Sequence, residues 1–467
     1  MIFASFEFLF LFLPLFFAGY FATPERYRNI PILLFSWAFY AWWRIDFLAL
    51  LVAVTVFTYT VARLMDLAGP RTERGQVLMV AGLIGNLGVL ACFKYANFGV
   101  TTFNQLIGMF GAPPVGWTEI VLPIGLSFYV LQSVSYLVDI RRGTVPVSRS
   151  FLNYAAYKAI FSQLIAGPIV RYAEIADELK HRHHSLAQFG RGASIFMIGF
   201  AMKTALADTL SPLVEAVFTL AAPTLVDAWT GAVAYTLQLY FDFAGYSLMA
   251  IGLARMIGFH FPQNFNTPYL SGSIQDFWQR WHMTLSRFLR DYLYIPFGGN
   301  RKGPRRTYVN LMMVMAIGGL WHGSSWNFII WGVWHGGMLA VHRWWSRRPG
   351  YTPMPYALGN ALTMLGVLLG WVVFRAKDFA NTAAMLGGMV GLHGVGMSDQ
   401  LAWQATPDRM WFIPIAAAFI YWPLLRDRLG RPQFGPVVQT VAPLAGFVLA
   451  MVLLYSRDAV PFLYFQF

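Results

Sequence analysis

Charged residues and cysteine are scarce in this chain. Asp, Glu, Lys and Arg make up only 12% of the 467 residues, whereas 57% are hydrophobic. A water-soluble fold of this length could not bury so much apolar surface, so this balance excludes a soluble protein. The single cysteine, Cys92, excludes an intrachain disulfide and a cysteine metal cluster. Its apolar surroundings predict a thiol packed inside the protein.

Three common catalytic signatures are also missing. The sequence has no Gly-x-Ser-x-Gly turn, no glycine-rich phosphate loop ending in Lys-Ser/Thr, and no His-Glu-x-x-His helix. Serine hydrolases, nucleoside triphosphatases and zinc peptidases of these types therefore lack their characteristic residues here. We expect no metal and no tightly bound cofactor.

Long apolar runs are what the chain has in abundance. With their flanks they approach the ~20 residues that cross a bilayer as a helix, and they occupy residues 8–20, 47–61, 77–93, 231–253 and 446–455. The first run contains Glu7 at its edge and follows no basic residue, so we interpret it as a retained span. The pattern predicts an all-α polytopic membrane protein of about eleven or twelve crossings.

Basic residues gather between these runs and give a net charge of +13. We place the clusters on the cytoplasmic side and both termini on the opposite side. The clusters lie near residues 26–28, 63–74, 141–149, 171–191, 280–306, 343–348 and 426–431. Gly/Pro breaks at 167–168, 258–275 and 297–304 predict re-entrant or interfacial segments beside a cavity. We treat residues 1–467 as a single membrane domain.

The segment 275–294 alternates aromatic and basic side chains. Spacings of three and four predict one amphipathic helix, with an aromatic face (Trp278, Trp281, Leu285, Phe288, Tyr292) and a basic edge (Arg280, Arg287, Arg290). The arginines either bind an anionic substrate or face lipid phosphates from an interfacial helix. His282 is either a buried, hydrogen-bonded histidine or a polar group that lines a pocket.

A basic turn follows, formed by Asn300, Arg301, Lys302, Arg305 and Arg306. It suits contact with phosphate or with an acidic protein surface, and a simple cytoplasmic loop explains it equally well.

Two Trp-His-Gly triplets lie in apolar surroundings within 318–337. An ionisable group inside a spanning segment is a functional candidate, so we favour His322, where Gly318, Gly319 and Gly323 are expected to break the helix. His335 would be about 20 Å away along a continuous helix, so only one of the two is expected to do chemistry. Structural hydrogen bonding is the alternative for both.

A neutral imidazole in an apolar site is a suitable general base for taking a proton from a hydroxyl. This chemistry suits acyl transfer from a thioester. Transport is the alternative, because a few charged residues lie inside predicted spans; they are scattered and show no broken-helix symmetry, and they are Glu7, Lys203, Asp208 and Asp242.

Many blocks in one order resemble the membrane-bound O-acyltransferases, and among them the members that acetylate alginate. These blocks are residues 8–14, 39–44, 93–99, 122–129, 164–168, 238–247 and 277–294, followed by 298–303 and 318–323. The resemblance covers most of the chain, with a core at about 118–343. It implies a ring of helices around a thin centre that is crossed by a tunnel.

The resemblance also implies an activity and a set of site residues. Such proteins take an acyl group from a cytosolic thioester, either acetyl-CoA or an acyl carrier protein. They pass it to a periplasmic partner and onward to an exported polysaccharide. His322 matches the catalytic histidine and His282 a second polar position that would position or polarise the acyl carbonyl. The predicted donor-binding residues are Trp278, Arg280, Trp281, Arg287, Arg290, Asn300, Arg301, Lys302, Trp321, Ser324 and Asn327.

The implied location is the bacterial inner membrane, with both termini in the periplasm. Alginate is the expected polymer, and cellulose or peptidoglycan are the alternatives. A non-catalytic transporter or scaffold of an export complex is a further alternative.

Overall fold

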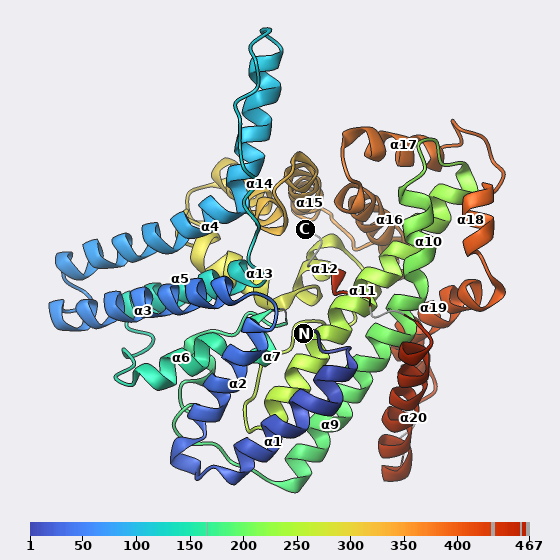
Figure 1. Ribbon diagram of the computed structural model, residues 1–467. Helices are drawn as coiled ribbons and strands as arrows, with labels where there is room; N and C mark the ends of the chain where they lie inside the picture. The colour runs from blue at the N-terminus through green and yellow to red at the C-terminus, as the bar shows by residue number, and fades with distance from the viewer. Residues whose placement is uncertain (166, 431–434, 458–459, 464–467) are drawn as a thin grey trace. The chain divides into compact units, whose positions relative to one another are not determined.

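The computed structural model describes residues 1–165, 167–430, 435–457 and 460–463. All regular secondary structure in these ranges is helical (Figure 1). The predicted class, an all-α polytopic membrane protein, is confirmed. Two compact units account for the chain, one made of residues 1–193 and 250–262, the other of 194–249 and 263–467. Helices α9 (Leu186–Ala201) and α11 (Leu225–Met256) each contribute residues to both units.

The first unit is built on phenylalanine packing. Phe12 contacts the rings of Phe8, Phe16, Phe39 and Phe161 at centroid separations of 5.1–6.3 Å. These rings hold helices together without any polar partner, as expected for apolar helices. The helices of the unit are α1 (Leu13–Ala22), α2 (Asn29–Ala41), α3 (Ile45–Ala68), α4 (Glu73–Gly108), α5 (Leu126–Arg142), α6 (Phe151–Ala159), α7 (Phe161–Leu164) and α8 (Tyr172–Ile175).

The second unit carries the polar segments that the sequence singled out. Its helices after α9 are the π-helical turn η3 (Met202–Ala207), α10 (Asp208–Phe218), α11, the turn η4 (Pro268–Leu270), α12 (Ile274–Arg280), α13 (Met283–Leu289), the π-helical turn η5 (Arg290–Tyr294), α14 (Pro304–His322), α15 (Trp326–Trp345), α16 (Tyr356–Arg375), α17 (Phe379–Met389), α18 (Asp399–Gln404), α19 (Pro407–Arg428) and α20 (Pro436–Tyr455). Helices α14 and α15 lie side by side (Figure 1).

Five helical stretches in the described part of the chain are long and apolar enough to cross a bilayer. They are Ile45–Ala68, Glu73–Gly108, Leu186–Phe218, Tyr356–Arg375 and Val437–Tyr455. Other helices such as α11, α15 and α19 have at least 20 residues but carry more polar side chains. A count of eleven or twelve crossings and the central tunnel therefore stay predictions.

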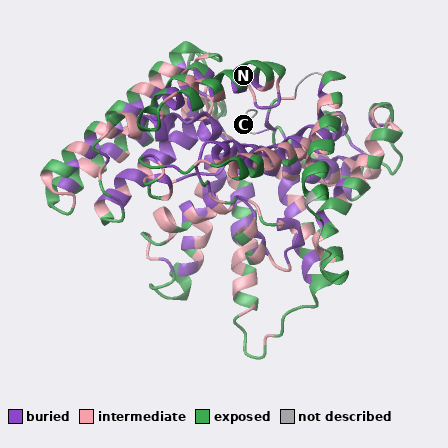
Figure 2. Ribbon diagram, turned by 90° about the horizontal axis from the view of Figure 1, so that it is seen from below, coloured by how far each residue is buried: buried purple, intermediate pink, exposed green. Residues whose placement is uncertain are grey.

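Large apolar side chains remain exposed along many helices, which Figure 2 shows as green stretches beside buried purple ones. In a bilayer these side chains contact lipid. Cys92 belongs to this exposed surface on α4, so the prediction of a packed thiol is wrong. The local apolar pattern shows that a position avoids water, but it does not distinguish a protein core from a lipid-facing surface.

The predicted break at 258–275 is confirmed, because only η4 and the start of α12 are helical there, and the turn before Pro304 is confirmed as well. The predicted break at Gly318 and Gly319 is wrong, since both lie inside α14, which ends at His322 before Gly323. Gly319 instead permits close packing: a β-carbon there would lie 2.1 Å from the backbone oxygen of Phe328 on α15.

Three of the four charged residues predicted inside spans lie together, whereas Glu7 lies apart from them in η1 (Glu7–Phe12). Lys203 on η3 pairs with Asp208 at the start of α10, and its Nζ lies 3.2 Å from a carboxylate oxygen of Asp242 on α11. All three side chains are buried. Lys203 also donates a hydrogen bond to the backbone oxygen of Val460, and Asp242 accepts one from the backbone of Leu463. The network explains how these charges are tolerated, because each has an opposite charge or a hydrogen-bond partner.

Candidate active site

The backbone breaks at His282. The sequence predicts a single helix over 275–294, but α12 ends at Arg280 and α13 begins at Met283, so that prediction is wrong. His282 has a left-handed backbone with φ of 42°. The backbone oxygen of Asn264 accepts a hydrogen bond from the Met283 N–H at 2.9 Å, which fixes the break. Left-handed non-glycine residues are strained, and such strain concentrates at functional sites.

A buried polar network orients the His282 ring. Its Nδ1 lies 3.0 Å from Oδ1 of Asn264, which also accepts a hydrogen bond from the Thr284 hydroxyl at 2.8 Å. The Asn264 amide nitrogen in turn donates to the Ser247 hydroxyl at 3.1 Å. An amide oxygen accepts only, so Nδ1 of His282 carries the proton. The neutral ring then presents Nε2 as an acceptor.

Nε2 of His282 has no hydrogen-bond partner among the residues that the structure describes, although the whole side chain is buried. His282 lies in a connection outside the five spanning candidates, and burial lowers the pKa of its imidazole below the ordinary value. A buried acceptor of this kind needs a partner, and a bound substrate would supply one.

His322 lies at the C-terminal end of α14, close to His282. The two ring centroids are 6.5 Å apart with an interplanar angle of 61°. His322 is buried and contacts Trp321, Trp331 and Phe374 at centroid separations of 5.0, 5.1 and 5.4 Å. The break at His282 and the end of α14 thus bring together two histidines that are forty positions apart.

Aromatic rings surround both histidines. Trp281 stacks on Tyr269 with an interplanar angle of 7°, and it packs against Phe277 and Trp371. Phe243 meets the His282 ring edge-on at 4.8 Å. These side chains make an apolar environment in which hydrogen bonds and partial charges act strongly, because little water screens them.

His335 belongs to the same aromatic cluster. Its ring contacts Trp331 at 4.8 Å and Trp278 at 5.3 Å. Because α14 and α15 are separate helices that pack together, the assumption of one continuous helix from His322 to His335 is wrong, and both histidines contact Trp331. His335 is enclosed by rings, and neither of its ring nitrogens has a hydrogen-bond partner among the described residues, so the structural hydrogen bonding expected for it is not seen there.

The predicted binding residues divide into four groups, of which three lie apart from the histidine pair. Arg280 and Arg290 form ion pairs with Asp276 and Asp291, so these carboxylates partly neutralise the charges of the two arginines. The basic turn is exposed at all five of its predicted positions, Asn300, Arg301, Lys302, Arg305 and Arg306. Asn327 is buried and donates a hydrogen bond to the backbone of Ala376, which is a structural contact.

The remaining members lie near the histidines or beside them in sequence. Trp281 and Trp321 contact His282 or its neighbours, Trp278 contacts Trp331 and His335, and Ser324 is half-buried just beyond α14. Arg287 is half-buried on α13.

Sequence reasoning missed Asn264 and Ser247. Asn264 sits in a loop that the Gly/Pro pattern marks as non-helical, eighteen positions before His282. A loop asparagine is usually exposed, so no local pattern shows that this one is buried beneath a catalytic candidate. The described residues contain no cluster of three or more His, Cys, Asp or Glu that could hold a metal ion.

This helical membrane chain with paired histidines belongs to the membrane-bound O-acyltransferase family, whose sequence model matches residues 144–376. It is a multi-pass membrane O-acyltransferase. The chain is 44% identical to the probable alginate O-acetylase AlgI of Azotobacter vinelandii over the full length of both proteins, and is therefore AlgI-like.

Two further relatives are informative. A peptidoglycan O-acetyltransferase of Helicobacter pylori is 38% identical, with 84% of this chain and 80% of the relative aligned. A teichoic acid D-alanyltransferase of Bacillus subtilis is 26% identical, with 65% of this chain and 83% of the relative aligned.

Replacing Asn264 with alanine tests the role of the buried network. The change removes the acceptor that holds Nδ1–H of His282, so we expect acyl transfer to fall by about ten- to hundred-fold, by analogy with groups that orient metal-binding histidines. The measurement is kcat and KM of transfer by the purified protein, and the loss is expected in kcat. Asn266→Ala is the matched control, since Asn266 is exposed in the same loop. Unchanged kcat in Asn264→Ala would remove the network from the mechanism.

Proposed function

We propose that this protein moves acetyl groups from a cytoplasmic thioester, through the membrane, toward hydroxyl groups of an exported polysaccharide, with alginate as the polymer. The observation that carries the proposal is the pair of buried imidazoles, 6.5 Å apart, in an aromatic environment. The likeness to the AlgI proteins supports acetyl as the group and alginate as the polymer.

In the proposed reaction His322 is the general base. It takes the proton from the acceptor hydroxyl while that oxygen attacks the thioester carbonyl carbon. The tetrahedral intermediate then collapses, the carbon–sulfur bond breaks, and the proton passes from His322 to the departing thiolate. The products are an acetyl ester and a free thiol, so atoms and charge balance.

His282 has a positioning role in this scheme. Polarising the acyl carbonyl would require a donor, whereas the neutral ring held by Asn264 offers Nε2 as an acceptor. We therefore assign His282 to accept a hydrogen bond from an N–H or O–H of the bound substrates. The walls formed by Trp281 and Trp321 would exclude water, which otherwise competes with the hydroxyl as nucleophile.

The donor is acetyl-CoA or an acetylated carrier protein. Both are anionic at the surface that would approach the membrane, and the exposed charges of Arg301, Lys302, Arg305 and Arg306 would attract them. Arg280, Arg287 and Arg290 form the second half of this proposed basic surface. We propose that the basic turn faces the cytoplasm at a bacterial inner membrane, with both termini in the periplasm, because basic loops are enriched on the cytoplasmic side.

A periplasmic acetyltransferase partner would complete delivery to the polymer. A second candidate acceptor is peptidoglycan, because the Helicobacter pylori relative is a peptidoglycan O-acetyltransferase at 38% identity.

The test is complementation. The protein is expressed in two bacterial strains, one that lacks its own alginate O-acetylase and one that lacks its peptidoglycan O-acetyltransferase. The cytoplasmic acetyl-CoA pool is labelled, and ester-linked acetate is then measured on each polymer. We expect labelled acetate on alginate. Restoration on peptidoglycan alone would replace alginate by the second candidate. Labelled acetyl that crosses proteoliposomes without ester formation would favour a transporter and contradict the proposal.

A further inference from the structure

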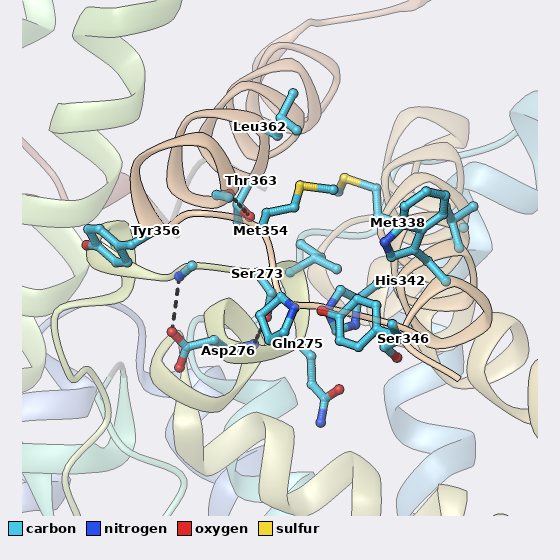
Figure 3. A pocket seen from close by; sticks show the side chains of 18 of the residues that line it. Ser273, Gln275, Asp276, Met338, His342, Ser346, Met354, Tyr356, Leu362 and Thr363 are labelled. Atoms are coloured by element: carbon cyan, nitrogen blue, oxygen red, sulfur yellow. Dashed lines mark hydrogen bonds between the residues drawn. The ribbon is translucent and has the colours of Figure 1, made fainter. Parts of the chain in front are cut away.

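A large groove lies on the second unit, and neither of the paired histidines lines it. It runs between α15 and α16 and is closed at one end by the start of α12 and by the loop that joins α15 to α16. Its volume is about 1110 Å³. Figure 3 shows Met338 from α15 and Met354 from the loop meeting across it, with Leu362 and Thr363 on the α16 side.

The walls of the groove are mainly apolar. Val333, Trp334, Met338 and Val341 line it from α15, and Leu362 from α16. The α16 segment is one of the five stretches long and apolar enough to cross a bilayer, so this wall lies at membrane depth.

Polar side chains also line the groove, among them Gln275, His342 and Tyr351, but its one carboxylate is occupied. Asp276 accepts a hydrogen bond from the Gly272 backbone and forms an ion pair with Arg280 at 2.7 Å (Figure 3 shows the bond to Gly272). An apolar slot with a neutralised acid fits a hydrocarbon chain better than a cationic or strongly hydrated ligand.

Arginines and tryptophans gather where α15 ends. Trp345 lines the groove, and Arg348 lies over the ring of Trp344 at 3.6 Å and that of Trp345 at 5.0 Å. Arg343 lies in the last turn of α15 and Arg347 follows just beyond it in the sequence. In the described part of the chain no acidic side chain pairs with any of the three arginines. Tryptophan and arginine at the end of a membrane helix mark the depth of the lipid headgroups.

We propose that this groove is a binding site for an anionic phospholipid. One acyl chain occupies the slot between α15 and α16, and the phosphate lies among Arg343, Arg347 and Arg348. The occupant follows from charge: unpaired cations stand at headgroup depth beside an apolar slot, and the surrounding bilayer supplies molecules with an anionic head on a hydrocarbon chain. This inference does not depend on the identity of the acetylated polymer.

Gly337 offers a substitution that tests the slot. It lines the groove from α15, and a β-carbon at this position would meet no atom within 4 Å. A side chain can therefore begin at this position without a clash, and Gly337→Phe is the variant expected to fill the slot. Gly88→Phe is the matched control, because Gly88 is an exposed glycine within α4 that also has open space around it.

The experiment is native mass spectrometry of the purified, delipidated protein titrated with phosphatidylglycerol or phosphatidylcholine. We expect one tightly bound phosphatidylglycerol, with at least about ten-fold weaker binding in Gly337→Phe and none of this loss in Gly88→Phe. Arg347→Gln and Arg348→Gln should each weaken phosphatidylglycerol about five-fold, the effect expected of one basic side chain near an anionic headgroup, and leave phosphatidylcholine unchanged.

Several results would overturn the proposal. Equal affinity for the two lipids would show that the arginines do not bind the headgroup. Unchanged phosphatidylglycerol binding in Gly337→Phe would show that the acyl chain does not occupy the slot. Displacement of the lipid by acetyl-CoA would assign the groove to the acyl donor. A dimer that Gly337→Phe dissociates would assign it to a second copy of the chain. Arg347 and Arg348 are exposed, so their replacement by glutamine should not impair folding. The two arginine variants therefore test the headgroup contact even if the glycine variant fails to fold.

Discussion

His322→Ala is expected to lower acetyl transfer by about 10²- to 10⁴-fold, the usual contribution of a positioned general base. His322 is buried, and its ring lies 6.5 Å from that of His282, a separation that a reacting hydroxyl could bridge. Alanine would remove the proposed base and leave the surrounding aromatic side chains in place, so the loss should fall on kcat more than on KM. The measurement is ester-linked acetate formed from labelled donor by equal amounts of membrane-inserted protein.

His181→Ala is the control for this experiment, because His181 is an exposed histidine of the other unit. Normal transfer by His322→Ala would exclude His322 as the base. If deletion of the whole protein abolished acetylation while His322→Ala did not, a scaffold in an export complex would become the better explanation. His282→Ala with transfer intact would likewise assign His282 to structure alone.

Lys203→Met should lower the free energy of unfolding by about 3–5 kcal/mol, the cost of removing one partner of a buried ion pair. Lys203 contacts both Asp208 and Asp242, and each of these side chains is at most 8% exposed. Methionine keeps the length of the side chain but leaves two carboxylates without their shared cation. The measurement is equilibrium unfolding in mixed detergent micelles, followed by tryptophan fluorescence.

Lys377→Met is the matched control, since Lys377 is exposed and should change stability by less than about 0.5 kcal/mol. Adding Asp242→Asn to Lys203→Met should restore part of the loss, because it removes one of the two uncompensated charges. Additive losses in the double variant would show that the three groups are not energetically coupled and would contradict the network.

The membrane class and the end of the helix at Gly323 could be predicted because both depend on local sequence. Apolar runs such as 47–61 lie within α3, and the Gly323 that follows His322 ends α14. The break at His282 could not be predicted in this way. Residues 275–294 follow one amphipathic pattern, but backbone hydrogen bonds to a distant loop interrupt the helix. These bonds join Met283 to Asn264 and Asn266 to Arg280.

Two other errors have the same origin. Lys203, Asp208 and Asp242 look isolated along the chain, and only the packing of α11 against η3 and α10 joins them. His322 and His335 look remote along one helix, and only the turn between α14 and α15 brings both against Trp331. Side chains that meet across separate helices leave no periodic signal in the sequence.

The left-handed backbone at His282 has a consequence for the evolution of robustness. Glycine would adopt this conformation without the roughly 1–2 kcal/mol that a β-carbon costs there. The buried ring, however, hydrogen-bonds Asn264 and packs edge-on against Phe243, and removing a buried aromatic side chain costs about 3–5 kcal/mol. The packing of the imidazole therefore outweighs the strain of its backbone, so libraries screened only for melting temperature should reject glycine at position 282.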